Sequence, residues 1–129
     1  MKHYTSIEQS KKLLELGLNP ESADMYFIRC YGNYYAHFNE EGHIGEKFGP
    51  CWSLTALFEI LPNDEVTSTT VTRGGWNIEP PKYLDIWFAE YETENHDNDF
   101  SLSANNPIDA AFEMICRLLE NDYLTINKI

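Results

Sequence analysis

The densest group of ionisable side chains in this chain lies between residues 90 and 99. Carboxylate oxygens are the ligands that divalent cations such as calcium prefer, and an imidazole nitrogen can add a further ligand. The spacing lacks the central glycine and the final glutamate of an EF-hand loop. A solvated hairpin turn, in which Asp and Asn bond to nearby backbone, accounts for the same residues and is the favoured interpretation. The candidate metal ligands are Glu94, His96, Asp97 and Asp99.

A second group with metal-binding chemistry comprises His37, Glu40, Glu41 and His43, with Cys30 on the preceding strand. Zinc binds imidazole, thiolate and carboxylate groups that converge in space. The two histidines flank a glycine-containing loop and do not share a helix face, so the spacing of helical zinc proteases does not apply. Ordinary loop residues are the favoured interpretation. A metal-binding protein or small hydrolase that uses either the acidic or the histidine loop is the alternative function.

Cys51 is the cysteine with a positional argument for reactivity, because it precedes a predicted helix whose N-terminus can lower the pKa of a thiol. A small buried side chain between Pro50 and Trp52 is the ordinary role of such a cysteine. No serine lies in a nucleophile-elbow pattern. The sequence therefore predicts no catalytic residue and no cofactor, and favours a protein that is not an enzyme.

The aromatic side chains indicate a different kind of site, since Tyr and Trp are enriched where proteins bind proteins. The polar-tipped rings are too many for all to lie deep inside the protein: Tyr26, Tyr31, Tyr34, Tyr35, Trp76, Tyr83, Trp87 and Tyr91. A strand predicted from Tyr83 to about Thr93 places Ile86 and Phe88 on one face and Trp87 on the other. Two alternatives remain open for Trp87, which is either exposed or packed against another element. Glutamates follow Phe88 on its face, so the strand is expected to leave the core there or to contain a bulge. The candidate partner-binding residues are Trp87, Glu90, Tyr91 and Glu92.

Apolar periodicity and capping residues predict helices at residues 6–16, 53–61 and 106–121, with a short helical turn at 20–24. Two pairs have the spacing of a capping box at the first helix, Thr5 with Glu8 and Ser6 with Gln9, and Ser53 and Asn106 are the predicted caps of the other two helices. In the second helix one apolar stripe is predicted, made by Leu54, Leu57, Phe58 and Leu61. Strands are expected at residues 25–31 and 34–38, joined at Gly32-Asn33, and at 66–72, 83–93 and 100–104, while residues 39–50 read as a loop. The predicted fold is one α+β domain over residues 1–129. It has a small antiparallel sheet with about three helices packed on one face.

The charge of the chain is strongly negative, with nine Lys and Arg against twenty-one Asp and Glu, a net of −12. So few cations disfavour direct nucleic-acid binding and attraction to an anionic membrane. The balance suits a basic protein partner, or solubility alone. Three cysteines without a CxxC pair, and the lack of an apolar secretion signal or bilayer-spanning run, predict a cytoplasmic location.

Three well-capped stretches resemble a group of small uncharacterised proteins from bacterial phages and mobile elements. They are Ile7 to Gly17, Pro50 to Pro62 and Asn106 to Ile115. The resemblance is confined to helical segments, and it implies a phage or mobile-element origin without implying an activity.

These features together favour a non-enzymatic, acidic interaction protein whose carboxylates attract a basic protein. A sharper form of this hypothesis is a mimic of nucleic acid that occupies the basic groove of a nuclease or regulator. A homodimer that uses the aromatic strand face is a third alternative.

Overall fold

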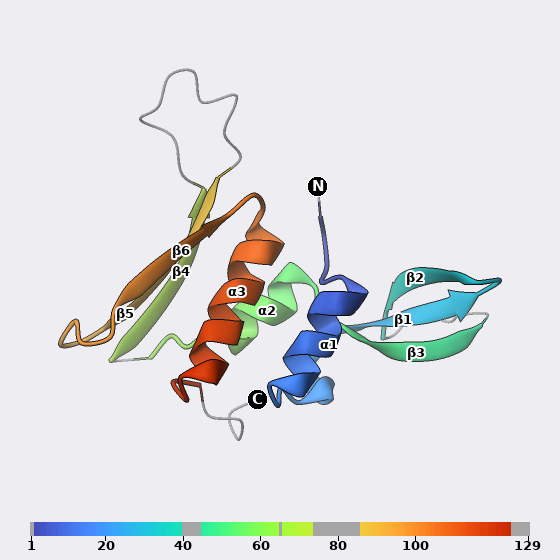
Figure 1. Cartoon of the computed structure of the whole chain (residues 1–129), viewed down its shortest axis with the longest axis horizontal. Coiled ribbons are helices and arrows are strands. Elements are labelled where there is room, and N and C mark those ends of the chain that lie inside the picture. The colour runs from blue at the N-terminus through green and yellow to red at the C-terminus, as the bar shows by residue number, and fades with distance from the viewer. Residues whose placement is uncertain (1, 40–44, 65, 74–85, 125–129) are drawn as a thin grey trace, which may run out of the picture.

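The computed structural model describes residues 2–39, 45–64, 66–73 and 86–124. Figure 1 shows two antiparallel sheets at opposite ends of the molecule, with the helices between them. The first sheet has the strand order β2-β1-β3, and the second has the order β4-β5-β6. The predicted α+β class is confirmed, and the strands are divided between two sheets where the sequence predicts one.

The described helices and strands lie in a mixed order along the chain. In chain order they are α1 (Ile7–Glu15), the 3-10 helix η1 (Pro20–Ser22), β1 (Met25–Cys30), β2 (Asn33–Phe38), β3 (Glu46–Cys51), α2 (Leu54–Ile60), β4 (Thr67–Arg73), β5 (Trp87–Thr93), β6 (Phe100–Ala104) and α3 (Pro107–Glu120).

Local capping residues set the starts of the three α-helices. The Ser6 side chain accepts a bond from the Gln9 amide, and the Gln9 side chain accepts one from the Ser6 amide. This reciprocal capping box lies at the second of the two predicted positions. Ser53 caps α2 and Asn106 caps α3, as predicted. These ends depend on neighbouring residues alone, which is why the sequence predicts them well.

The loop prediction for residues 39–50 is wrong in its second half, because Glu46–Cys51 forms strand β3. This strand pairs antiparallel with β1, with Met25 opposite Cys51 and a register shift between Phe27 and Ile28. Pro50 cannot donate a ladder hydrogen bond, but β3 lies at the edge of its described sheet, where proline is tolerated. The pairing with β1, rather than the local sequence, makes this segment a strand.

The main core lies between α2, α3 and the inner face of the β4-β5-β6 sheet. Leu57, Ile108 and Met114 are fully buried there. The predicted apolar stripe of α2 is partly wrong, because Ala56 and Ile60 face this core while Phe58 is exposed. Phe58 therefore lies on the outer side of α2, while the buried side of this helix packs against α3. No described helix is long and apolar enough to cross a bilayer.

Candidate functional site

Strand β5 turns Trp87, Ala89 and Tyr91 toward the core and its acidic residues toward solvent. Trp87 packs against the core cluster, Ala89 is fully buried and Tyr91 is 5% exposed. Phe88, Glu90 and Glu92 alternate with them and are exposed. Of the two alternatives for Trp87, the structure therefore has the packed one. The predicted apolar face through Phe88 is wrong, and the described part of β5 pairs continuously with β4 and β6 without the expected bulge.

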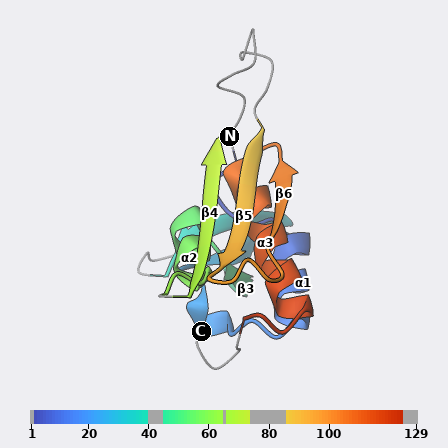
Figure 2. The same cartoon turned by 90° about the vertical axis from the view of Figure 1, so that its left-hand side faces the viewer.

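The outer face of this sheet combines carboxylates with hydroxyl groups. Figure 2 looks onto this face, with α2 and α3 behind the strands. Glu90 lies opposite Thr70 on β4 and Ser101 on β6, and Glu92 lies opposite Ser68. Glu90 and Glu92, two of the four predicted partner-binding residues, thus share one exposed face. Trp87 and Tyr91 lie on the other face of the strand.

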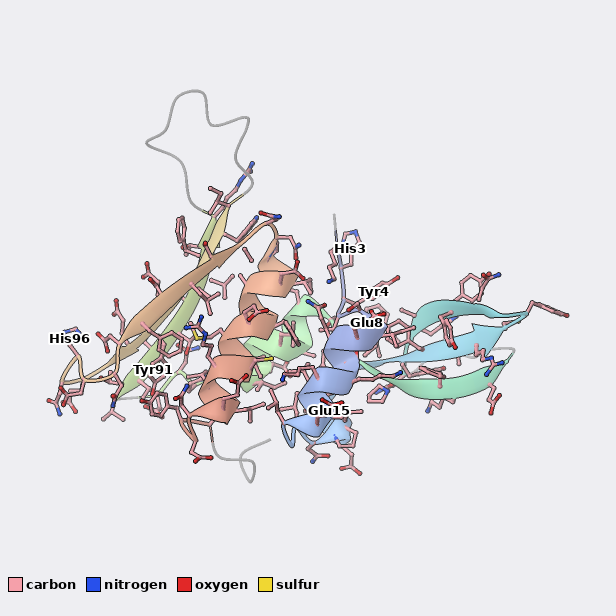
Figure 3. The ribbon with its side chains drawn as sticks, viewed as in Figure 1. His3, Tyr4, Glu8, Glu15, Tyr91 and His96 are labelled. Carbon is pink, nitrogen blue, oxygen red and sulfur yellow. The ribbon has the colours of Figure 1, made fainter. Side chains whose placement is uncertain are left out.

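Tyr91 has a structural role that its burial explains. Its ring stacks on Tyr123 with centroids 5.7 Å apart and contacts Phe100 at 5.5 Å. Burial raises the pKa of Tyr91, and the nearby Tyr123, Asp64 and Asp99 raise it further. In Figure 3 Tyr91 lies along the body of the sheet, whereas His96 lies at the tip of the hairpin that joins β5 to β6.

The predicted metal-ligand cluster at this tip is a self-contained hairpin turn. Asp99 accepts bonds from the Thr93 amide at 2.8 Å and the Thr93 hydroxyl at 3.2 Å, and its other oxygen lies 2.8 Å from Nδ1 of His96. The hydrogen bond from the Thr93 amide, and to a smaller extent the one to His96, lower the pKa of Asp99. The hydrogen bond to Asp99, and to a smaller extent the negative charge of Asp99, raise the pKa of His96. Glu94 and Asp97 do not complete a ligand set, and within the described residues no group of three or more His, Cys, Asp or Glu is arranged to hold a metal ion.

The second predicted metal group divides between the described residues and a part of the chain outside them. Glu40, Glu41 and His43 lie outside the described residues. His37 lies on β2, where its ring stacks on Tyr26 with a centroid distance of 6.3 Å. The described members of this group are therefore His37, which packs on the buried Tyr26, and Cys30, which lies opposite Asn33 at the end of β1.

Cys51 is placed for packing and not for nucleophilic attack. The residue is fully buried, and its thiol lies 3.5 Å from the carbonyl oxygen of Thr5. Burial is the main reason that the pKa of Cys51 rises to about 12, against a smaller lowering by the Thr5 hydroxyl. A thiol with such a pKa carries almost no thiolate at neutral pH, and the thiolate is the reactive form.

The first sheet carries an aromatic surface. It includes Tyr31, Tyr34 and Tyr35, three of the polar-tipped rings that are too numerous in the sequence for all to be buried. Among the described residues ten large apolar side chains are exposed, and half of them lie on this sheet or its hairpin turn. Tyr34 and Tyr35 are neighbours on an edge strand, so their rings lie on opposite faces of the sheet. The predicted partner-binding residues lie on β5 instead, and Phe48 lies in a segment that was predicted to be a loop. We call these residues the aromatic surface: Tyr31, Tyr34, Tyr35, Phe38 and Phe48.

Tyr31 occupies an unusual position at the tip of this sheet. The β1–β2 turn is formed by Tyr31 and Gly32, one residue earlier than predicted, and both have positive φ, at 51° and 80°. Two positive φ values define the hairpin turn that favours Asn-Gly, because a Cβ is strained in this conformation. The Tyr31 side chain is nevertheless 98% exposed. It therefore adds strain to the turn without adding packing to the core.

A groove of about 500 Å³ lies at the base of the same sheet. Residues of β1, β3 and η1 line it, together with Ala23 and Asn39, so that it lies where the sheet meets η1. The ammonium of Lys47 lies 4.3 Å from the centroid of the Tyr26 ring. The side chains that shape the groove include Pro20, Glu21, Tyr26, Lys47, Phe48 and Pro50.

Comparison with known proteins gives no relative for this arrangement. No protein-family model, no curated protein and no solved structure matches the chain. Its function therefore has to be inferred from the two exposed sheets and the groove.

Proposed function

We propose that this chain is a non-enzymatic protein that binds a basic protein partner through its aromatic surface. The observation that carries the proposal is the fully exposed Tyr31, held in a strained turn at the tip of an aromatic-rich sheet. Tyr side chains supply large contact areas with little loss of conformational entropy, and clustered exposed apolar groups are typical of interaction sites. A residue that strains its own turn and packs against nothing is better explained by a partner than by stability.

The ionisable groups of the described residues support binding over catalysis. Burial raises the pKa of Cys51 and of Cys116 to about 12 each, which disfavours both as nucleophiles. His96 and Asp99 bond to each other within one hairpin turn, on the opposite sheet from the groove. The alternative of a metal-binding protein or hydrolase therefore has no observation in its favour among these residues.

The net charge of −12 supports a basic partner, because it attracts a basic surface and repels an acidic one. The outer face of the β4-β5-β6 sheet, with Glu90 and Glu92, adds to this attraction. The proposal includes a cytoplasmic location. It also includes a phage or mobile-element origin, which the resemblance of the helical segments supports.

The test is capture of a partner from lysate of the native host by the full chain and by two matched variants. The first variant combines Tyr31→Asn with Tyr35→Thr, substitutions that suit a turn and a strand. The control combines Phe58→Gln with Phe88→Thr, which also removes two exposed rings but from α2 and β5. We expect a basic protein that the wild type and the control retain and the first variant loses. Equal retention by all three, or equal loss from both variants, would refute a specific role of the aromatic surface.

A second experiment tests the contribution of the acidic face. The triple variant Glu90→Gln, Glu92→Gln and Glu94→Gln is compared with Glu8→Gln, Glu15→Gln and Glu59→Gln, which removes the same charge from exposed helix positions. We expect only the first triple to slow association at low salt, because rim and distant charges act mainly on the association rate. Identical rates and salt dependence for both triples would remove the acidic face from the proposal.

A further inference from the structure

We propose that two copies of this chain pair through the outer edge of β2, antiparallel to each other, so that their three-stranded sheets form one continuous sheet. The two-fold axis passes through the middle of the pair, where Ala36 of one copy lies opposite Ala36 of the second. A homodimer is among the alternatives that the sequence leaves open, and the interface proposed here is a strand edge of the first sheet. The inference goes beyond the proposed function, because the pairing needs no basic partner.

The two edges of the β2-β1-β3 sheet differ in how they are protected against pairing with another chain. Natural edge strands discourage such pairing with charged side chains, proline and bulges. β3 has Glu46, Lys47 and Pro50. Its register with β1 also shifts, between Phe27 and Ile28. β2 has the sequence NYYAHF, without Lys, Arg, Asp, Glu or Pro, and its register with β1 is continuous. Within the described sheet, β2 is thus the edge that is suited to pair with another strand.

The edges of the β4-β5-β6 sheet are less suitable. The chain itself covers the start of β4, because the Asp64 side chain accepts a bond from the Thr67 amide at 2.9 Å and the Asp64 amide donates to the Thr67 carbonyl at 3.0 Å. The Thr69 amide donates to the side chain of Asn63 at 3.1 Å. β6 has five residues and is the shortest of the described strands, and a short edge offers little to pair with.

The hydrogen bonds of β2 show which of its backbone groups face outward. Its register with β1 continues to Asn39, whose amide donates to the Asp24 carbonyl at 3.0 Å. Bonded residues alternate along an antiparallel pair, so Tyr35 also directs its backbone groups toward β1. Tyr34 and Ala36 direct theirs away from β1, and no described strand pairs with β2 on that side.

A second copy fits this edge in a self-complementary register. When Ala36 lies opposite Ala36 of the second copy, the outward amide and carbonyl groups of this residue bond across the axis. Tyr34 then lies opposite Phe38 of the second copy, once on each side of the axis. These two side chains are 42% and 49% exposed in the single chain, and aromatic cross-strand pairs stabilise antiparallel sheets. The protected β3 edge at each end of the joined sheet stops the assembly at two copies.

The distribution of charge favours β2 for this contact. The net charge of −12 repels a second copy, but Glu90 and Glu92 lie on the sheet at the opposite end of the molecule (Figure 1). β2 itself carries no Asp, Glu, Lys or Arg. The repulsion between two copies therefore acts over a distance and is screened by salt, so the association strengthens as the salt concentration rises. Binding of a basic partner weakens under the same change, which separates the two kinds of contact.

The experiment is sedimentation equilibrium of the full chain and of two variants, Ala36→Lys and Ala36→Glu. At the two-fold axis each variant brings like charges together, whereas an equal mixture of the two brings opposite charges together. We expect the wild type to dimerise, each variant alone to be a monomer, and the mixture to dimerise again. A folding defect in either variant would persist in the mixture, so the recovery reports a contact between copies. Ser101→Lys and Ser101→Glu, at an exposed position of β6, are the controls and leave the dimer intact.

Several results would overturn the proposal. A monomeric wild type would do so, as would Ala36 variants that dimerise like the wild type. A mixture that stays monomeric, although circular dichroism shows both variants to be folded, would contradict the register. If both variants unfold, the smaller change Ala36→Cys decides, because two Cα atoms within about 7 Å allow a disulfide between copies on oxidation. No more cross-linking than in the wild type, with its own three cysteines, would then refute the pairing. A monomeric wild type whose partner capture is lost in folded Ala36→Lys would assign this edge to a strand of the partner instead.

Discussion

Replacement of Tyr31 by asparagine separates the stability of this fold from its proposed function. Tyr31 has a φ of 51° and is followed by Gly32 at 80°. A non-glycine residue in the left-handed region is strained by about 1 kcal/mol or more, and asparagine tolerates this region better than tyrosine. Because the Tyr31 side chain is 98% exposed, its removal leaves no cavity. We therefore expect Tyr31→Asn to stabilise the protein by about 0.5–1 kcal/mol.

The same estimate can be expressed as a melting temperature. An unfolding entropy of about 2.1 cal/mol/K per residue near 60 °C gives roughly 270 cal/mol/K for 129 residues. A gain of about 0.5–1 kcal/mol then raises Tm by about 2–4 °C. Urea denaturation and thermal unfolding, both followed by circular dichroism, measure the two quantities independently.

Tyr35→Asn is the matched control, because Tyr35 lies on β2, where asparagine is disfavoured. We expect this variant to lose stability while Tyr31→Asn gains it. A Tyr31→Asn protein that is less stable than the wild type would refute the argument that the turn is strained by its tyrosine. A more stable variant that also loses the partner would assign Tyr31 to binding, since unfolding could not account for the loss.

Three further predictions follow from the polar contacts of the described residues. Burial raises the pKa of Asp109, but hydrogen bonds from Lys2, Gln9 and Asn106 lower it more, so the net pKa is lowered. Asp109→Asn should therefore lower the free energy of unfolding by about 1–2 kcal/mol at pH 7, after allowance for solvent screening. This loss should disappear as the pH falls through the lowered pKa of Asp109, and Glu113→Gln is the control that should not show it. In the native protein iodoacetamide should modify Cys30 long before Cys51, which mass spectrometry of the digested product detects; equal rates would contradict the burial of Cys51. In an NMR titration the pKa of His96 should lie above its ordinary value, and in Asp99→Asn it should return toward that value. The stability that His96 gains from Asp99 is therefore present at low pH and is lost as the pH rises through the raised pKa.

The parts of the fold that depend on neighbouring residues could be predicted from the sequence. The capping pair Ser6 and Gln9, the Ser53 cap and the Asn106-Pro107 start of α3 each act within one helical turn. Strands β4 and β6 also fall close to their predicted ranges. In each case the signal and the structure it specifies lie within a few residues of each other.

The parts that depend on distant contacts could not be predicted in this way. β3 contains Gly49 and Pro50, which disfavour a strand locally, and it forms because β1 lies beside it. Ala89 and Tyr91 form the inner face of β5 because they pack beneath α3, whereas Phe88, an apolar residue next to Ala89, lies on the outer face. The predicted partner-binding residues of β5 are divided between its two faces for the same reason. The alternation along the strand indicates two faces but does not show which of them α3 covers.

The separation of the two sheets limits what the acidic face can contribute to binding. The aromatic surface and the carboxylates of Glu90 and Glu92 lie at opposite ends of the molecule, with helices between them (Figure 1). One helix with its side chains is about 10–12 Å across, which exceeds the Debye length of about 8 Å at physiological salt. A partner that docks only on the aromatic surface is therefore screened from these glutamates once it is bound. Their effect should appear in the association rate at low salt, where the screening length is about 30 Å, and a change in the dissociation rate would show that the partner extends across both sheets.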